Sequence, residues 1–342
     1  MGNATISEVA KMAGVSTATV SRVINNLGIV SPATKAKVKN AIRLLDYSPS
    51  AAARSLSTQE SNCIGLIIPD VANPFFAEVA HNICIDLHKN GLISMLYQTA
   101  DDARMDIMVL ESIRQQRLGG AIYIPGSQHS SPLSDERIKH LIRILQIPLV
   151  LFDQSIAGIS QNGVFSDNFG GGHLCGNALV DAGNSNIVVI AGEQDLKPRR
   201  DRLDGFKAAL VKNGLELPEE RILLGNFEED QSYAVTKKYL LNCKGSLPDA
   251  FFVCNNTSSR GFLKAVFELG YTIPKDFAYL GYDPLNEIEI FGYRYSSLDR
   301  DIKAMCKKAV ELLLRQIQGE DDAIEQVFVT PTLRLFGSER KG

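Results

Sequence analysis

The stretch Thr5-Ile-Ser-Glu-Val-Ala-Lys-Met-Ala-Gly-Val-Ser-Thr-Ala-Thr-Val-Ser-Arg-Val-Ile-Asn25 predicts two short helices joined by a tight turn. Thr5 is a good N-cap, and Glu8 three positions later completes a capping box at the start of the first helix. Gly14 ends that helix because glycine adopts the left-handed conformation at little cost, and Ser16 caps the second helix. Apolar residues recur at helical spacing in both segments: Ile6, Val9, Ala10, Ala13, Val20, Val23 and Ile24.

The outward face of the second predicted helix carries short or hydrogen-bonding side chains: Thr17, Ala18, Ser21, Arg22 and Asn25. A helix that enters the major groove of DNA needs such side chains, because base edges are read by hydrogen bonds and methyl contacts. The spacing alone is equally compatible with a small helical pair that binds no nucleic acid.

The same stretch closely resembles the N-terminal headpiece of the LacI/GalR family of bacterial transcription regulators. The matching segments, in the family's order and spacing, are Val9-Ala10, Ala13-Gly14-Val15-Ser16 and Thr19-Val20-Ser21-Arg22-Val23-Ile24-Asn25. The resemblance implies that Thr17, Ala18, Thr19 and Arg22 lie at the major groove and that Ser16, Ser21 and Asn25 hold phosphates. We also expect Thr5 to contact DNA.

Length and composition indicate a globular protein of two or three domains, with 342 residues, 45% of them hydrophobic and 22% charged. No apolar run approaches the ~20 residues that span a bilayer, and no signal pattern opens the chain, so we expect a cytoplasmic, nucleoid-associated protein. The six cysteines are scattered singly, which predicts neither a disulfide framework nor a zinc site.

Charge is distributed unevenly along the chain. Residues 1–60 contain seven Lys and Arg against three Asp and Glu, a net +4, whereas residues 61–342 carry a net −7. A third helix, expected from Ser31-Pro32 to about Leu45, contributes four of the basic residues. A basic small domain on an acidic larger one fits electrostatic binding of phosphates, although a solvated lysine face is the alternative.

A short segment, Tyr47–Ser57, connects the headpiece, residues 1–48, to the rest of the chain. Its proline and alanines favour a helix that is too short to be stable alone in water. In the resembling family, this segment (49–60 here) is a hinge helix that folds on operator DNA. The match at Ala53-Arg54-Ser55-Leu56 implies that Leu56 wedges into the minor groove, with Arg54 and Ser57 beside it. A plain helical linker with Leu56 packed on the body is the alternative.

From residue 61 onward, apolar strands alternate with amphipathic helices, which predicts parallel sheets covered on both faces. We expect strands at Ile64–Ile68, Leu92–Tyr97, Gly120–Ile124, Leu149–Phe152, Ile187–Ile190, Ala250–Cys254 and Ala278–Leu280. Helices are expected at Pro74–Lys89, Ala103–Gln116, Phe169–Ala182, Arg202–Asn213, Gln231–Asn242, Ser258–Leu269 and Asp301–Gln318. About eleven strands are too many for one open sheet, so the core (61–342) should form two α/β lobes.

The predicted fold is thus a small all-α helix-turn-helix headpiece followed by an α/β core of two parallel-sheet lobes. By the family resemblance, the core is similar to type I periplasmic binding proteins, whose chain crosses between lobes three times. The crossings are expected near residues 165–167, 291–295 and 325–328. This assigns about 61–165 and 294–325 to the N-lobe and about 166–293 and 326–342 to the C-lobe. No heptad tail follows Thr330, so we expect a homodimer.

Enzymatic signals are weak throughout the sequence, and we expect no catalytic residues, no metal site and no cofactor. The run Gly170-Gly171-Gly172 with Gly176 could suggest a dinucleotide-binding loop. The alternative is close packing of a helix start, since the preceding strand is barely four residues and Asp167-Asn168 is typical of an N-cap.

Polar and aromatic residues follow several predicted strands, where ligands bind in open parallel sheets. Each has an ordinary structural interpretation as a turn former or helix cap, but their repetition favours a cleft for a sugar. The resemblance implies the same, through Asn73-Pro74-Phe75-Phe76, Arg202-Leu-Asp-Gly-Phe206 and Gly281-Tyr282-Asp283. The predicted effector-binding residues are Asn73, Phe75, Phe76, Asp153, Arg202, Phe227, Asn255, Asp283 and Arg300.

The chain departs from the family pattern at Asn256 and at residues 336–338. Arg300 lies near a position where many relatives carry glutamine, and Asn256 stands where many have aspartate. Phe336-Gly337-Ser338 replaces an Arg-x-Ser pattern. The asparagine puts the hydrogen-bond pattern of the cleft in doubt, whereas the last change should affect only packing.

The sequence therefore predicts a dimeric operator-binding regulator of a carbohydrate-utilisation operon, controlled by a small sugar in the inter-lobe cleft. One alternative is a regulator of the same fold that uses a purine or a phosphorylated protein as corepressor. The other is a sugar-binding transport component, which the headpiece and the lack of a leader argue against.

Overall fold

The computed structural model describes residues 4–24, 28–47, 61–126, 132–192, 197–243, 245–320 and 323–342. The chain divides into two compact units, residues 1–61 and 62–342. Four residues assigned to DNA contacts, Asn25, Arg54, Leu56 and Ser57, lie outside the described residues, as does the predicted hinge.

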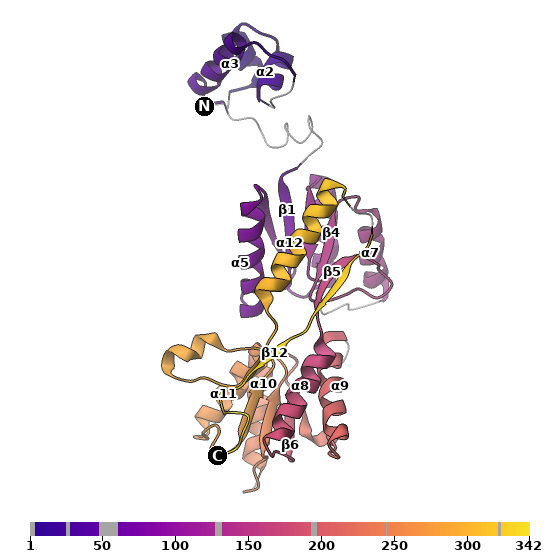
Figure 1. Ribbon diagram of the computed structural model, residues 1–342, viewed down its shortest axis with the longest axis vertical. Coiled ribbons are helices and arrows are strands. Elements are labelled where there is room, and N and C mark those ends of the chain that lie inside the picture. Colours follow the sequence, from indigo (N-terminus) through magenta and orange to yellow (C-terminus); the bar gives the residue numbers. More distant parts are fainter. Residues whose placement is uncertain are drawn as a thin grey trace. The chain divides into compact units, whose positions relative to one another are not determined.

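The headpiece consists of three helices, α1 (Ile6–Ala13), α2 (Thr17–Ile24) and α3 (Pro32–Leu44) (Figure 1). The capping box is confirmed: the Glu8 amide donates to Thr5 Oγ1 at 3.3 Å, and the Thr5 amide donates to Glu8 Oε2 at 2.6 Å. Gly14 ends α1 in the left-handed conformation, at φ +67°. A small core holds the helices together: Val9, Ala10, Ala13, Val20, Val23, Val38 and Ala41.

The first lobe contains a six-stranded parallel sheet with the order β11-β5-β4-β3-β1-β2. Its strands are β1 (Cys63–Ile68), β2 (Ile93–Gln98), β3 (Gly120–Tyr123), β4 (Leu149–Phe152), β5 (Asn162–Ser166) and β11 (Gln326–Val329). Helices α5 (Pro74–Lys89) and α12 (Ile302–Gln318) pack on one face of the sheet (Figure 1). Helices α6 (Ala103–Gln116) and α7 (Pro132–Ile144) pack on the other face.

The second lobe is built in the same way, with the strand order β12-β10-β9-β8-β6-β7 and one antiparallel pair, β10 with β12. Its strands are β6 (Ile187–Ala191), β7 (Ile222–Leu224), β8 (Ala250–Val253), β9 (Ala278–Gly281), β10 (Ser297–Asp299) and β12 (Thr332–Arg334). Helices α8 (Asn168–Asp181) and α9 (Lys197–Lys212) cover one face. Helices α10 (Glu229–Asn242) and α11 (Asn256–Glu268) cover the other, and short 3-10 turns lie at Glu219–Arg221 and Asn286–Phe291.

Two of the three predicted lobe crossings were wrong by one strand. The first falls at residue 167, as expected, but β10 belongs to the second sheet because Ser297 pairs with Gly281 of β9. Strand β11 belongs to the first sheet, where Gln326 pairs with Gly163 of β5. The second and third crossings therefore lie at residues 300–301 and 330–331, and residues 294–299 and 326–329 exchange lobes relative to the prediction.

Helices α8 and α9 touch through glycines. A Cβ on Gly172 would lie 2.0 Å from the carbonyl oxygen of Arg202, and a Cβ on Gly205 would lie 2.0 Å from the carbonyl oxygen of Phe169. A Cβ on Gly176 would approach Ala209 Cβ to 2.6 Å. The glycine-rich start of α8 thus permits close helix packing, which supports that interpretation over a dinucleotide-binding loop.

No helix among the described residues is both long and apolar enough to cross a membrane. The six cysteines carry free thiols.

The glycine contact yields a stability prediction. Gly205→Ala forces a methyl group into the α8 backbone, so we expect a loss of about 2 kcal/mol or more in the free energy of unfolding, despite alanine's better helix propensity. Urea denaturation measures the free energy of unfolding of the variant and the wild type. Val211→Ala, on the exposed side of α9, is the matched control and should change stability by less than about 0.5 kcal/mol. Equal stability of the two variants would contradict the close contact.

Candidate ligand-binding cleft

A cleft of about 630 Å³ lies between the two lobes of the core, at the carboxyl ends of both sheets. Asp153 follows β4 in the first lobe, while Asn255 and Asp283 follow β8 and β9 in the second. The structure brings all nine predicted effector-binding residues to this one cleft: Asn73, Phe75, Phe76, Asp153, Arg202, Phe227, Asn255, Asp283 and Arg300.

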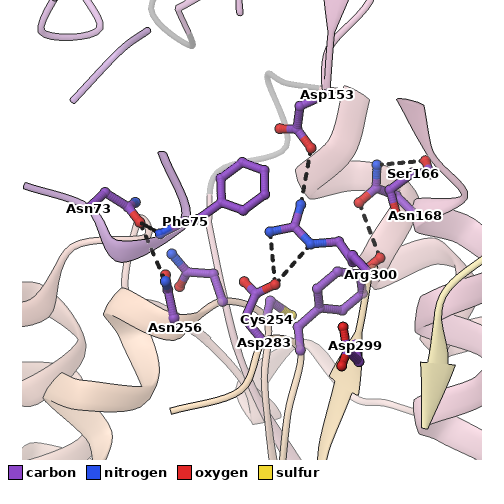
Figure 2. A network of polar contacts seen from close by, with 12 residues as sticks. Asn73, Phe75, Asp153, Ser166, Asn168, Cys254, Asn256, Asp283, Asp299 and Arg300 are labelled. Carbon is purple, nitrogen blue, oxygen red and sulfur yellow. Dashed lines mark hydrogen bonds and ion pairs between the residues drawn. The ribbon is translucent and has the colours of Figure 1, made fainter. Parts of the chain in front are cut away.

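A buried ion cluster joins the two lobes at the floor of the cleft (Figure 2). Arg300 Nη1 donates to Asp153 Oδ1 at 3.0 Å, and Arg300 Nη2 and Nε donate to Asp283 Oδ1 at 2.8 and 2.9 Å. These three residues are 3%, 7% and 6% exposed, respectively. Burial alone would lower the pKa of Arg300, but attraction by Asp283 and Asp153 outweighs it and raises the pKa. The guanidinium is thus firmly charged.

Guanidinium groups cover three of the aromatic rings in and around the cleft, and one of them is Phe227, whose ring centroid lies 4.9 Å from the guanidinium carbon of Arg199. The Arg300 guanidinium carbon lies 3.9 Å from the centroid of Phe75, and that of Arg202 lies 3.9 Å from the centroid of Tyr282. Phe75 is itself buried, so its ring packs against a cation rather than facing the cleft openly. Phe76 and Phe227 remain half-buried and line the cleft as predicted.

Arg202 is fixed by neutral acceptors. Its Nε donates to Asn168 Oδ1 at 2.8 Å and its Nη1 donates to the carbonyl oxygen of Cys254 at 2.8 Å. The hydroxyl of Tyr282 donates to the same Asn168 oxygen at 3.2 Å. Arg202 is only 4% exposed. It lies within α9 and not at its start, since the helix begins at Lys197 and not at Arg202 as predicted. A buried cation with neutral partners attracts an electron-rich ligand oxygen.

Asparagines at the cleft serve as both helix caps and lining residues. Asn73 Oδ1 accepts from the Phe75 amide at 3.0 Å at the start of α5, and Asn255 Oδ1 accepts from the Ser258 amide at 3.0 Å at the start of α11. Asn256 Nδ2 also donates across the cleft to Asn73 Oδ1, at 3.4 Å. An aspartate at position 256 could not donate this bond, so the departure from the family pattern permits an inter-lobe contact.

Several lining residues escaped the sequence analysis. Asp101 follows β2, so the strand-end rule could have found it. Further lining residues come from α10, α11 and the turn before α10, where no strand-end signal marks them, among them Glu228, Glu229, Gln231 and Arg260.

The predicted DNA-contacting residues of the headpiece occupy α2 and its cap. Thr17, Ala18 and Arg22 are exposed, and Thr19 and Ser21 are half-buried. Ser16 Oγ accepts from the Thr19 amide at 3.2 Å, so this side chain caps α2, as the spacing predicted. The exposed residues form the outward helix face that a major groove would receive.

Two family models match this chain, one in each of its two compact units. Residues 5–50 match the model for bacterial regulatory proteins of the lacI family, and residues 177–336 match the periplasmic binding protein-like domain. The chain is 31% identical to an HTH-type transcriptional repressor, PurR, of Mannheimia succiniciproducens, over 99% of each chain.

Solved structures extend the likeness to the fold. A complex of the transcriptional regulator CelR with cellobiose is 25% identical, with a TM-score of 0.70, over 97% of this chain and 98% of that one. The lac repressor dimer bound to operator and the anti-inducer ONPF is 23% identical, with a TM-score of 0.84, over 99% and 100% of the two chains.

The first lobe contains a further buried carboxyl, that of Asp106. Asp106, fully buried in the first turn of α6, accepts from the Gly126 amide at 3.4 Å. Burial raises the pKa of Asp106 to about 6, although contacts with the hydroxyls of Thr99 and Tyr123 offset part of the rise. Between about pH 4 and pH 6, the folded chain therefore retains a proton that the unfolded chain has released, and stability falls as pH rises.

This shift predicts the effect of Asp106→Asn, which mimics the protonated carboxyl. At pH 7.5 the variant should have a higher free energy of unfolding by up to about 3 kcal/mol, and at about pH 4 the gain should vanish. Urea denaturation at the two pH values measures this difference. Asp181→Asn, at an exposed acid, should change stability by less than about 0.5 kcal/mol at either pH. A gain independent of pH would contradict the proposed titration.

Proposed function

This chain belongs to the lacI family of bacterial regulatory proteins, and we propose that it represses a carbohydrate-utilisation operon under the control of a small sugar bound in the cleft. Membership makes the chain a DNA-binding repressor with a ligand-binding core, in a family that is not enzymatic. The sugar, the operon and the residues that contact each are the proposal, as are a cytoplasmic location and a homodimer like that of the lac repressor structure.

The composition of the cleft carries the sugar assignment. Carboxylates, amides and guanidinium groups from both lobes converge there beside half-buried aromatic rings, the mixture that recognises hydroxyl groups and C–H faces of a sugar. Arg300 bonds to Oδ1 of both Asp153 and Asp283, so Oδ2 of each can accept from a ligand hydroxyl. The volume of about 630 Å³ suits a small ligand.

A purine that acts as corepressor is the second candidate. The observation that favours it is the 31% identity, over nearly the whole chain, to a relative named PurR. The two candidates differ in sign: an inducing sugar lowers operator affinity, whereas a corepressor raises it. Operator titration with each ligand class therefore distinguishes them.

The mechanism couples the cleft to the headpiece through the linker. Each headpiece would place Thr17, Ala18 and Arg22 in a major groove, and Ala18 offers only a methyl contact, which suits a thymine methyl group. Paired hinge segments would insert two copies of Leu56 into the minor groove between them. A ligand that changes the angle between the lobes alters the hinge spacing, and a 100-fold change in DNA affinity requires only about 2.7 kcal/mol.

A thermal-shift screen against pentoses, hexoses, disaccharides and purines tests the cleft. The ligand that binds should raise the Tm of the wild-type protein by mass action and leave that of Arg202→Ala unmoved, because the variant loses the buried cation. Arg200→Ala removes an exposed arginine of the same helix and should respond like the wild type. Both variants should keep operator binding. A full response in Arg202→Ala would remove this residue from the site.

The hinge assignment predicts a selective loss of DNA binding. Leu56→Ala should weaken operator binding by tenfold or more, because the wedge is lost. This corresponds to about 1.4 kcal/mol or more in binding free energy. Binding to random DNA should stay nearly intact. Fluorescence anisotropy with operator and scrambled duplexes at one salt concentration measures both. Leu133→Ala, at an exposed leucine of the core, is the control and should leave both affinities unchanged. Equal losses on both duplexes would contradict the wedge.

A further inference from the structure

We propose that Arg300 is an internal latch, which holds the two lobes together without any ligand. Arg300 lies at the second crossing, between β10 of the second lobe and α12 of the first. Its guanidinium bonds to one carboxylate from each lobe, Asp153 and Asp283. A ligand in a two-lobed binding protein closes a cleft by bridging its walls, and here a side chain of the protein makes such a bridge.

The chemistry of arginine suits this role. Its planar guanidinium presents several donors in fixed directions, so it can serve two carboxylates at once. Lysine has one point charge, and the glutamine that many relatives carry nearby has no charge and one short amide group. The ring of Phe75, at the first turn of α5, packs against the guanidinium and restricts its movement.

Burial determines what happens when the arginine is lost. Asp153 and Asp283 would then face each other across the cleft as two uncompensated, buried negative charges. Breaking a buried pair by removing one partner is costly, and the two lobes can relieve that cost by separating so that water reaches both carboxylates. The hydrogen bond from Asn256 to Asn73, which also joins the lobes, is neutral and contributes less than the cost of two buried unpaired charges.

The latch also changes what a ligand can do. When the latch already holds the lobes closed, a ligand gains little binding energy by closing them. The ligand can shift the equilibrium between the closed and open lobe arrangements only by its difference in affinity for the two. The latch thus makes the lobe arrangement a property of the chain itself. This inference concerns the protein without ligand or DNA, so it stands or falls independently of the proposed function.

Hydrogen–deuterium exchange of the full-length protein, without ligand, tests the latch. In Arg300→Gln, peptides covering residues 70–77 and 253–260, which face each other across the cleft, should exchange about tenfold faster than in the wild type. Asp153→Asn, which removes only the charge of the first-lobe anchor, should speed exchange in the same peptides, by less than Arg300→Gln because Arg300 stays paired with Asp283. Arg137→Gln is the control, since Arg137 pairs with Glu111 entirely within the first lobe, and it should exchange like the wild type.

Circular dichroism first establishes that each variant is folded, and Arg300→Lys provides a variant that keeps the charge while losing the double bridge. Its exchange should lie between those of the wild type and Arg300→Gln. Wild-type exchange rates in the cleft peptides of the folded Arg300 or Asp153 variants would overturn the latch. Faster exchange throughout the core, including the β1 and β6 peptides, would also overturn it, by showing general destabilisation instead of lobe opening.

Discussion

The buried guanidinium of Arg300 sets the geometry of the ligand-binding core. The second crossing segment must pass between two sheets, and at this point Arg300 is held by a carboxylate from each. Because a buried charge must be paired, the positions of both loops that carry these carboxylates are fixed together. The guanidinium of Arg300 also packs on the ring of Phe75, and this contact fixes the position of the start of α5. The cleft is therefore constructed around an electrostatic constraint, with hydrophobic packing confined to the two lobes on either side.

Close packing of α8 on α9 supplies a second constraint on the same site. Gly172 and Gly205 allow the two helix backbones to meet, and Arg202 lies on α9 three residues before Gly205. Its bond to Asn168, at the start of α8, is thus made across a helix pair whose spacing is fixed by backbone contact. The run of glycines could have indicated a dinucleotide-binding loop. Here it allows the close helix contact that positions the guanidinium of Arg202.

Local signals in the sequence were sufficient for the headpiece and for the composition of the cleft. Capping residues such as Thr5 and Gly14 act within one helical turn, and polar residues after strands converge because parallel strands end at a common edge. The lobe boundaries were not accessible in this way, since they depend on which strands pair, Ser297 of β10 with Gly281 of β9 and Gln326 of β11 with the distant Gly163 of β5. The bridge from Arg300 to Asp153 was equally hidden, because it joins residues separated by 147 positions.

Strands β11 and β12 occupy one edge of each sheet, although they are only two residues apart in sequence. Each lobe is consequently assembled from discontinuous pieces of chain, and both need residues 326–334 to complete their sheets. During synthesis on the ribosome, the earlier strands of both lobes emerge with these edges unpaired. Neither lobe can mature ahead of the other, and the two become complete together when this short segment emerges from the exit tunnel.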